Sequence, residues 1–356
     1  MIKYHYVRPL LARLPAETAH GLVLRALKAG LAPPAKLAED GSLAIKLWGR
    51  DFTNPIGLAA GFDKQAEVIG PMLAQGFGFV EVGSVTPKPQ PGNAKPRMFR
   101  LARDEGVINR LGFNSTGMDV VARNLAAFRG RGPSGSGLIG VNLGKNKESK
   151  DAASDYVMGA TRLTAFADYL VINVSSPNTP GLRALQDKAE LTHILVKVKA
   201  ALSRGGAEWR KPLLVKIAPD LTEADLADIA EMALAGLADG LIIGNTTITR
   251  PPELKSRARR EAGGLSGRPL LALSTRVLGE VYRLTHGRVP LIGVGGVGSA
   301  ADAYDKIRAG ASLVQLYSAL VFRGPELVGD IRQGLAALLG RDGFAKVAEA
   351  VGAAHR

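Results

Sequence analysis

Cysteine is absent from the 356-residue sequence. Without it the chain cannot form disulfides, Cys-ligated zinc or iron–sulfur centres, or a catalytic thiol. No run of about 18 consecutive apolar residues occurs, so no segment is expected to span a bilayer as a helix. Arg8 and Arg13 interrupt the apolar start of the chain without a small-residue cleavage pattern, so we expect no signal peptide.

Acidic residues are scarce relative to basic ones. The sequence has 32 Asp and Glu against 46 Lys and Arg, a formal net charge of +14. Such an excess is typical of proteins that meet nucleic acid, an anionic membrane or small acidic ligands. Aromatic residues make up only 5% of the chain, and none interrupts the basic run at 257–260. We therefore expect that run to be a solvated loop, and we expect no nucleic-acid partner.

The first fifty residues carry eight basic side chains and only three acidic ones. Apolar residues recur at helical spacing before and after Pro15, which predicts two short amphipathic helices ending near Gly30 and Pro33-Pro34. The pattern leaves two interpretations open. The helices pack on the main domain, or they lie in the headgroup layer of a membrane.

Beyond residue 45 the chain repeats one unit, a short apolar run followed by a helical pattern. Continuous hydrophobicity indicates strands that are buried on both faces, as in a parallel sheet covered by helices. Eight such runs without a Rossmann fingerprint predict an α/β fold with a closed (β/α)8 TIM barrel, and a doubly wound open sheet is the alternative. The predicted strands are 56–60, 77–82, 138–143, 169–174, 213–217, 240–243, 290–294 and 313–316.

Several connecting segments have their own signals. Residues 43–47 and Asp51-Phe52 predict a small hairpin that plugs the bottom of the barrel. Long insertions after the second and sixth strands are expected to build the active-site face. Thr222-x-x-Asp225 predicts the capped start of a helix. The last residues, 352–356, are expected to fray.

Polar side chains gather where the predicted strands end, the edge at which TIM barrels carry their chemistry. Asn142, Asn173, Asn178 and Asn245 all fall there. An amide both donates and accepts hydrogen bonds, so this set suits a planar ligand edged with C=O and N–H groups, such as a pyrimidine or a flavin. The pair Gly295-Gly296 precedes a helix, which predicts a phosphate site.

Lys216 interrupts the apolar fifth strand. It could form a Schiff base, stabilise an anionic cofactor or pair with a buried anion, and in every case it needs an anion nearby. No histidine falls at a predicted strand end, so a general base must be Ser, Lys, Tyr or a carboxylate. Ser176 in the turn Ser-Ser-Pro-Asn is the candidate in the right place, and a turn cap is the alternative.

Taken in order, these segments resemble the dihydroorotate dehydrogenases, specifically their membrane-associated, quinone-dependent class. The likeness covers nearly the whole chain, including the N-terminal helices. The matching stretches are GLAAGFDK at 57–64, EVGSVTPKPQPGN at 81–93, NRLGFN at 109–114, NVSSPNTPGL at 173–182, KIAPD at 216–220, NTT at 245–247, GGLSG at 263–267 and GVGG at 293–296.

The resemblance implies an FMN cofactor, a pyrimidine substrate and no metal. The positions that match the family's FMN contacts are Ala60, Gly61, Phe62, Asp63, Lys64, Ser84, Asn142, Asn173, Lys216, Gly244, Gly267, Gly296, Tyr317 and Ser318. Those that match its dihydroorotate contacts are Lys64, Asn109, Arg110, Leu111, Gly112, Phe113, Asn173, Asn178, Asn245 and Thr246. Ser84 and Gly244 stand where the family commonly has threonine.

The implied reaction is the oxidation of dihydroorotate to orotate in pyrimidine biosynthesis. Ser176 matches the base that removes the C5 proton while a hydride leaves C6 for the flavin, and Lys216 then stabilises the reduced flavin. A quinone takes the electrons. The resemblance further implies a quinone-entry segment at 1–42, a catalytic barrel at 43–356, a monomer, and peripheral attachment through the N-terminal helices to the anionic cytoplasmic face of the cell membrane.

Two related classes fit less well. The soluble dehydrogenases use a cysteine base and lack the N-terminal helices. A flavin-dependent reductase similar to the tRNA-dihydrouridine synthases is the alternative, because it shares the barrel and would use the positive charge. Those enzymes, however, normally use a cysteine acid and carry an extra RNA-binding domain.

Overall fold

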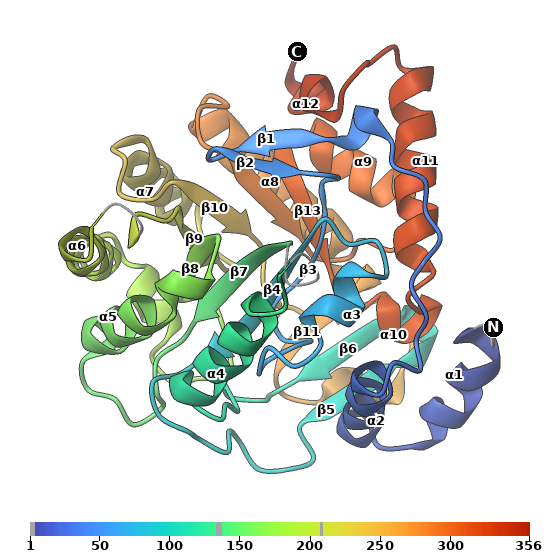
Figure 1. The fold of residues 1–356 in the computed structure, drawn as a ribbon, viewed down its shortest axis with the longest axis horizontal. Helices are drawn as coiled ribbons and strands as arrows, with labels where there is room; N and C mark the ends of the chain where they lie inside the picture. The colour runs from blue at the N-terminus through green and yellow to red at the C-terminus, as the bar shows by residue number, and fades with distance from the viewer. Residues whose placement is uncertain (1–3, 133–136, 207–208) are drawn as a thin grey trace.

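Eight parallel strands close into a barrel at the centre of the molecule (Figure 1). The structure is a computed structural model that describes residues 4–132, 137–206 and 209–356. The predicted TIM barrel is confirmed, and the open-sheet alternative is wrong. The strands are β3 (Ile56–Leu58), β4 (Phe79–Val85), β7 (Leu138–Leu143), β8 (Tyr169–Asn173), β9 (Leu213–Ile217), β10 (Gly240–Ile243), β12 (Leu291–Val294) and β13 (Ala311–Leu316). The predicted bounds of β7, β9 and β10 agree at both ends, and the others differ by one to three residues.

Helices surround the barrel, as the apolar strands require, because each strand needs cover on its outer face. These helices are α3 (Ile69–Leu73), α4 (Met118–Arg129), α5 (Ala152–Leu163), α6 (Lys188–Arg204), α7 (Glu223–Leu234), α8 (Leu271–Leu284), α9 (Ala300–Arg308), α10 (Leu320–Arg323), α11 (Leu327–Arg341) and α12 (Val347–Ala350). Thr222 and Asp225 form the predicted cap of α7, each side chain accepting from the other's backbone N–H.

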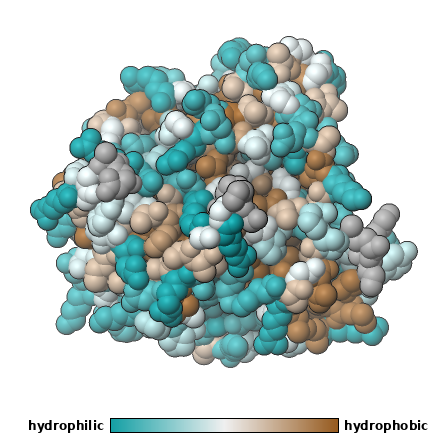
Figure 2. All heavy atoms as spheres, viewed as in Figure 1, coloured by the Kyte–Doolittle hydropathy of each residue, from teal (hydrophilic) through white to brown (hydrophobic). Residues whose placement is uncertain are grey.

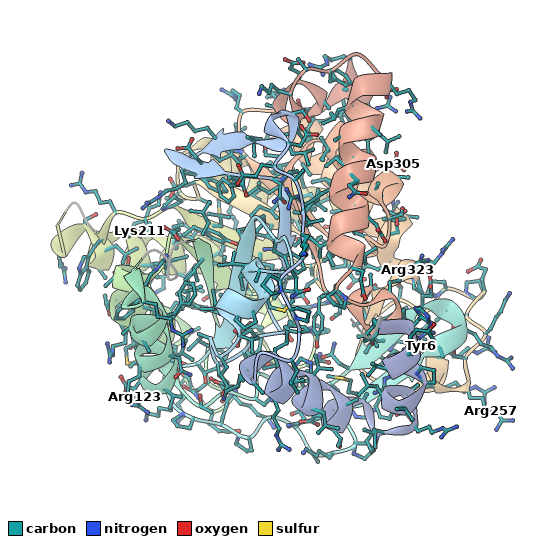
Figure 3. The ribbon with its side chains drawn as sticks, turned by 45° about the vertical axis from the view of Figure 1, so that its right-hand side comes forward. Tyr6, Arg123, Lys211, Arg257, Asp305 and Arg323 are labelled. Atoms are coloured by element: carbon teal, nitrogen blue, oxygen red, sulfur yellow. The ribbon has the colours of Figure 1, made fainter. Side chains whose placement is uncertain are left out.

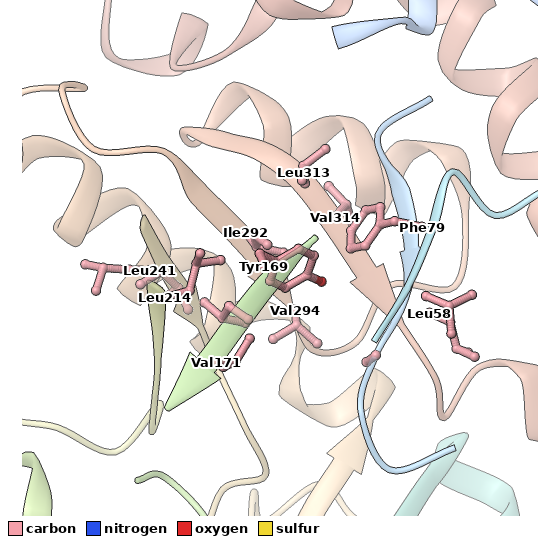
Figure 4. Close-up of a cluster of buried hydrophobic side chains, with 14 of the residues drawn as sticks. Leu58, Phe79, Tyr169, Val171, Leu214, Leu241, Ile292, Val294, Leu313 and Val314 are labelled. Atoms are coloured by element: carbon pink, nitrogen blue, oxygen red, sulfur yellow. The ribbon is translucent and has the colours of Figure 1, made fainter. Parts of the chain in front are cut away.

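A hairpin of β1 (Ile45–Leu47) and β2 (Arg50–Phe52) closes the amino-terminal end of the barrel, as predicted. The ring of Phe52 lies 5.5 Å from that of Phe79, and Trp48 lies 6.2 Å from Tyr169. Phe79 and Tyr169 are the first residues of β4 and β8, and Figure 4 shows them among aliphatic core side chains. Because the hairpin and these aromatic rings fill the amino-terminal end, a candidate site is expected at the carboxyl ends of the strands.

The two long insertions meet at that opposite end. The first forms β5 (Met98–Leu101) and β6 (Gly106–Asn109), and the second forms β11 (Gly264–Gly267). The three pair antiparallel in the order β11-β6-β5, with Gly264 opposite Asn109. Sequence patterning predicted that the insertions build the active-site face. It did not predict that they pair with each other.

Two amphipathic helices precede the barrel, as predicted: α1 (Tyr4–Arg13) and α2 (Ala16–Lys28). They lie beside β5 and α10 at the lower right of Figure 1, where Figure 2 shows hydrophobic residues gathering on the surface. Tyr6, Leu10 and Leu31 are exposed to 68%, 63% and 74%. No helix among the described residues is long and apolar enough to cross a membrane.

The C-terminal residues do not fray. The ring of His355 stacks on Tyr282 at 5.1 Å, and its Nε2 lies 3.1 Å from the carbonyl oxygen of Ala309. The expectation for this segment was wrong because a short polar tail carries no periodic pattern that would reveal a docking partner.

Candidate active site

One continuous cavity of about 700 Å³ runs from the N-terminal helices to the carboxyl ends of the barrel strands. Its outer part is lined by apolar side chains of α1 and α2, including Val7, Leu11 and Val23. Its inner part is lined by polar residues, including Asn173 and Lys216. The cavity thus offers an apolar entrance from the surface and a polar floor over the barrel.

A hydrogen-bonded amide network forms this floor. The Asn173 Nδ2 donates to Ser84 Oγ and to Asn142 Oδ1, both at 2.9 Å. The Asn173 Oδ1 accepts from the Ser175 hydroxyl at 2.9 Å, and the Ser175 Oγ accepts from Asn245 Nδ2 at 2.8 Å. Side chains from β4, β7, β8 and the loop after β10 are therefore held in fixed orientations, as the asparagines at strand ends suggested.

Two lysines bring positive charge to the cavity. Lys216 is 5% exposed, and burial lowers its pKa while the charge of Glu81 opposes that effect. Among the residues that the structure describes, no hydrogen bond or ion pair reaches its amine. The Lys64 Nζ donates to the carbonyl oxygen of Gly61 at 2.8 Å, and burial lowers its pKa to about 8. Both amines are available to an anionic ligand.

The candidate base lies on the loop that follows β8. Ser176 is 8% exposed, lines the cavity, and accepts from the backbone N–H of Asn178 at 3.3 Å. The hydroxyl oxygen of Thr179 is buried without a hydrogen-bond partner among the described residues. Among the described residues the Ser176 hydroxyl donates to no acceptor, so the turn is compatible with both a capping and a catalytic role.

Arg183 holds three active-site loops together. Its Nε donates to the carbonyl oxygen of Ser175 at 3.1 Å and its Nη2 to that of Thr246 at 2.8 Å. Its Nη1 forms an ion pair of 2.8 Å with Asp220 Oδ2, and Asp220 also accepts from the Thr247 hydroxyl. The loops after β8, β9 and β10 are thereby fixed to one guanidinium.

The segment at 109–113 forms another wall of the polar end. The Asn178 Nδ2 donates to Asn109 Oδ1 at 3.3 Å, across from the loop of the candidate base. Asn114 Oδ1 and Thr246 Oγ1 are buried polar atoms without a partner among the described residues. Both residues line the cavity, so a ligand with matching donors and acceptors would satisfy them.

The glycine cradle consists of Gly295 and Gly296, which follow β12, and Ser318, which lies just after β13. Gly296 has φ +83°, and a Cβ there would lie 2.6 Å from the backbone nitrogen of Leu271. In the described part of the chain, the backbone N–H groups of Gly296 and Ser318 donate to no acceptor. The Ser318 and Ser266 hydroxyls lie 2.8 Å apart beside them. These groups fit the phosphate of a flavin mononucleotide.

Most of the residues expected at the site line this cavity. They are Ala60, Gly61, Phe62, Lys64, Ser84, Asn109, Leu111, Gly112, Phe113, Asn173, Ser176, Asn178, Lys216, Asn245, Thr246, Gly267, Gly296, Tyr317 and Ser318.

Four expected residues lie behind the cavity wall. Asn142 acts through Asn173, as described above. Asp63 accepts from the backbone N–H groups of Glu67 and Val68, both at 2.8 Å. Gly244 has φ +111°, and a Cβ there would lie 2.6 Å from the carbonyl oxygen of Val294. The Arg110 Nη1 forms an ion pair of 2.9 Å with Glu261.

Three residues in this region were given no role from the sequence. Glu81 is a lone carboxylate inside an apolar strand, a signal that sequence reading could have used. Arg183 lies in what reads as an ordinary loop. His20 on α2 lines the apolar entrance, where burial lowers its pKa to about 4, and its Nε2 lies 3.0 Å from the carbonyl oxygen of Phe62.

Comparison with known proteins gives consistent matches over the full chain. The family described as "Dihydroorotate dehydrogenase" matches residues 42–339. "Dihydroorotate dehydrogenase (quinone)" of Rhodospirillum rubrum is 56% identical over 353 residues, covering 99% of this chain and 95% of that protein. The mitochondrial protein of the same description from Mus musculus is 51% identical, covering 99% and 90%. The crystal structure of ligand-free DHODH from Eimeria tenella superposes with a TM-score of 0.93 at 44% identity, covering 96% of this chain and 99% of that one.

Proposed function

The chain belongs to the dihydroorotate dehydrogenase family, and its full-length relatives are quinone-dependent enzymes, so we propose that it oxidises dihydroorotate to orotate with FMN and a quinone. This reaction introduces the C5–C6 double bond of orotate in pyrimidine biosynthesis. The observation that carries the proposal is the single cavity, which joins an amide-lined floor to an apolar entrance. One ligand can be oxidised at the floor while another arrives through the entrance.

We assign the flavin to the floor and the glycine cradle. Gly296 and Ser318 would hold its phosphate through unpaired backbone N–H groups, and Asn173 and Lys216 would face its ring. FMN, when bound there, supplies a two-electron acceptor for dihydroorotate and a donor for quinone. Lys216 contributes a positive charge that is already buried, so it needs no solvent reorganisation when negative charge develops.

We assign the substrate to the pocket between the segment at 109–113 and the loop after β8. Asn109, Asn178, Asn245 and Thr246 would bind the polar edge of the pyrimidine, and Lys64 would attract its carboxylate. The Ser176 oxygen would take the C5 proton of dihydroorotate while its own hydroxyl proton passes to the Thr179 hydroxyl or to a water. Serine is a weak base at its ordinary pKa, so that step depends on the group that accepts its proton.

We assign residues 1–42 to quinone entry and residues 43–356 to catalysis. The exposed Tyr6, Leu10 and Leu31 together with the basic residues of α1 and α2 support peripheral binding to an anionic membrane surface, and we propose that a monomer binds there on the cytoplasmic face. The apolar entrance between these helices and the barrel would receive the quinone from that surface.

Spectroscopy of the purified protein tests the proposal. It should be yellow with an FMN spectrum, bleach when dihydroorotate is added without oxygen, and recover its colour with a ubiquinone analogue. Flavin that does not bleach with dihydroorotate would contradict the proposed substrate. Recovery with fumarate or NAD but not with quinone would contradict the proposed acceptor.

A further inference from the structure

Only three ionisable side chains lie on the eight barrel strands: Glu81 on β4, Tyr169 on β8 and Lys216 on β9. They are 0%, 1% and 5% exposed. Burying an isolated charge is costly, and an apolar barrel interior would be at least as stable without one. The two opposite charges therefore point to a role beyond packing.

Glu81 accepts hydrogen bonds from side chains on three other barrel strands, β7, β8 and β13. The Asn142 Nδ2 donates to its Oε1 at 2.8 Å, while Gln315 Nε2 and the Tyr169 hydroxyl donate to its Oε2 at 2.6 Å and 3.2 Å. Gln315 leaves its own Oε1 without a partner in the described part of the chain. All three neighbours turn hydrogens toward Glu81, the arrangement that suits a carboxylate accepting through both oxygens.

The Glu81 carboxylate fixes the floor of the cavity through Asn142. Because Glu81 takes the Asn142 amide hydrogens, the Asn142 Oδ1 must face upward, where it accepts from Asn173 Nδ2 at 2.9 Å and from the Ser84 hydroxyl. A flipped Asn142 would turn its oxygen toward the Glu81 carboxylate, which is an acceptor, and its NH2 group toward the Asn173 amide, which is a donor. Asn173 and Ser84 both line the cavity, so their orientation depends on Glu81.

Lys216 is linked to Glu81 by charge. Its amine has no ion-pair partner among the described residues, and Glu81 is the carboxylate whose charge opposes the effect of burial on it. No other barrel strand supplies a charged side chain. Lys216 can therefore face the cavity as a cation because Glu81 balances it from below.

We propose that Glu81 is a positioning residue for the flavin site, which offsets the charge of Lys216 and fixes the amide of Asn142 from beneath the cavity floor. The inference rests on the proposed function, because it takes the ligand on that floor to be FMN. It predicts that Glu81 controls both the affinity for FMN and the reduction potential of the bound flavin.

Glu81→Gln tests this, because it removes the charge and turns an amide toward three donors. We expect FMN to bind about tenfold more weakly, as expected for one lost charge-assisted hydrogen bond. The reduction potential of bound FMN, measured without substrate or quinone, should exceed that of the parent, because the variant lacks the negative charge of Glu81 and leaves Lys216 unbalanced beneath the reduced flavin.

The other titratable groups do not account for this difference in reduction potential. Burial and the charge of Glu81 raise the pKa of Tyr169 well above its ordinary value. Lys64 faces the same cavity from the loop after β3, but it is present in both proteins and its contribution cancels in the comparison.

Two further variants separate charge from architecture. Tyr169→Phe removes one donor to the same carboxylate and keeps both charges, so its potential should follow that of the parent at every pH. Glu81→Asp keeps the charge but withdraws the acceptor from Asn142, so it should weaken FMN binding and retain the potential of the parent.

Parent values of FMN affinity and potential in Glu81→Gln would overturn the inference. If Glu81→Gln does not fold, Glu81→Asp decides the matter, and parent affinity in that variant would overturn it. A parent protein that binds no FMN would instead contradict the proposed function.

Discussion

At the scale of the residue, the proposed base depends on its immediate surroundings. Ser176 is almost buried, and the backbone N–H of Asn178 is the donor that reaches its oxygen. That contact lowers the cost of negative charge on the oxygen, and the unpaired hydroxyl of Thr179 lies three residues further along the same loop. The proposed role requires the Ser176 hydroxyl for fast flavin reduction by dihydroorotate but not for flavin binding.

Ser176→Ala should therefore retain FMN, but dihydroorotate should reduce its flavin much more slowly. Removing a positioned general base typically costs about 10² to 10⁴-fold in rate. Stopped-flow absorbance under anaerobic conditions at saturating dihydroorotate measures this step apart from quinone reduction.

Ser176→Cys is the matched variant, because it restores a group of similar size that can take a proton. A thiol has a lower ordinary pKa than a serine hydroxyl, so this variant should reduce its flavin faster than Ser176→Ala does, with a rate that increases toward alkaline pH. If Ser176→Ala reduces its flavin at nearly the parent rate, another group takes the C5 proton and Ser176 is not the base.

Individual site residues were predictable where they end a recognisable strand. Asn142, Asn173 and Asn245 follow apolar runs, so their convergence could be inferred from the parallel barrel alone. Glu81 was missed because the partners that explain it, Gln315 among them, come from strands far away in the sequence. Sequence shows a buried carboxylate but not the donors that satisfy it.

At the scale of the element, one side chain connects three loops. Arg183 contacts the carbonyl oxygens of Ser175 and Thr246 and the carboxylate of Asp220, so it sets the spacing of the loops after β8, β9 and β10. These loops carry the proposed base and three proposed substrate contacts, Asn178, Asn245 and Thr246. Removing the contacts of Arg183 should weaken substrate binding more than flavin binding.

Arg183→Gln should raise the dissociation constant for dihydroorotate and slow flavin reduction while FMN content stays unchanged. A lost hydrogen bond to a charged group is worth about 1.5–3 kcal/mol. If this entire loss appears in the binding of dihydroorotate, the affinity falls roughly tenfold to a hundredfold. Orotate titration, followed by the absorbance of bound FMN, measures the affinity of this pocket without turnover.

Arg162→Gln provides the control for this variant. Arg162 forms an ion pair of 2.8 Å with Asp119, but their side chains are 44% and 64% exposed and lie between outer helices. Such a surface pair contributes little, so this variant should match the parent. If Arg183→Gln binds orotate as tightly as the parent does, the three loops keep their positions without the contacts of Arg183.

Elements were predictable to the extent that their patterns are local. The eight strands are continuous apolar runs and the two N-terminal helices have clear helical periodicity, and their positions agree with the structure to within a few residues. The pairing of β11 with β6 could not be predicted, because it joins insertions separated by about half of the barrel. Antiparallel pairing of that kind is decided by tertiary packing rather than by either sequence segment.

At the scale of the whole molecule, basic side chains from distant segments lie on the same side as the apolar entrance. Tyr6, Arg257 and Arg323 lie on one side of the protein, whereas Lys211 and Arg123 lie on the other (Figure 3). The exposed apolar residues of α1 and α2 therefore have basic neighbours. Sequence alone located charge in the N-terminal helices but could not show that the loop at 257–260 lies on the same side.

The N-terminal helices form one wall of the cavity and are joined to the rest of the protein by hydrogen bonds and ion pairs. Glu17 forms an ion pair of 2.7 Å with Arg97, and Lys28 forms one of 2.7 Å with Glu67. The proposed substrate and flavin contacts all lie on the barrel side. Deleting residues 1–40 should therefore impair quinone reduction far more than flavin reduction by dihydroorotate, when the two half-reactions are measured separately.

A point variant makes this prediction independent of the deletion. Val23 lines the cavity from α2, so Val23→Glu places a charge in the apolar entrance. Losing the apolar contact of one side chain costs about 1.5–3 kcal/mol, which corresponds to roughly a tenfold to hundredfold rise in the KM for a quinone analogue. Arg25→Glu adds the same charged group on the same helix outside the cavity and should leave that KM much nearer to the parent value. Equal effects of the two variants would mean that the helices act through surface charge, and that the quinone does not pass between them and the barrel.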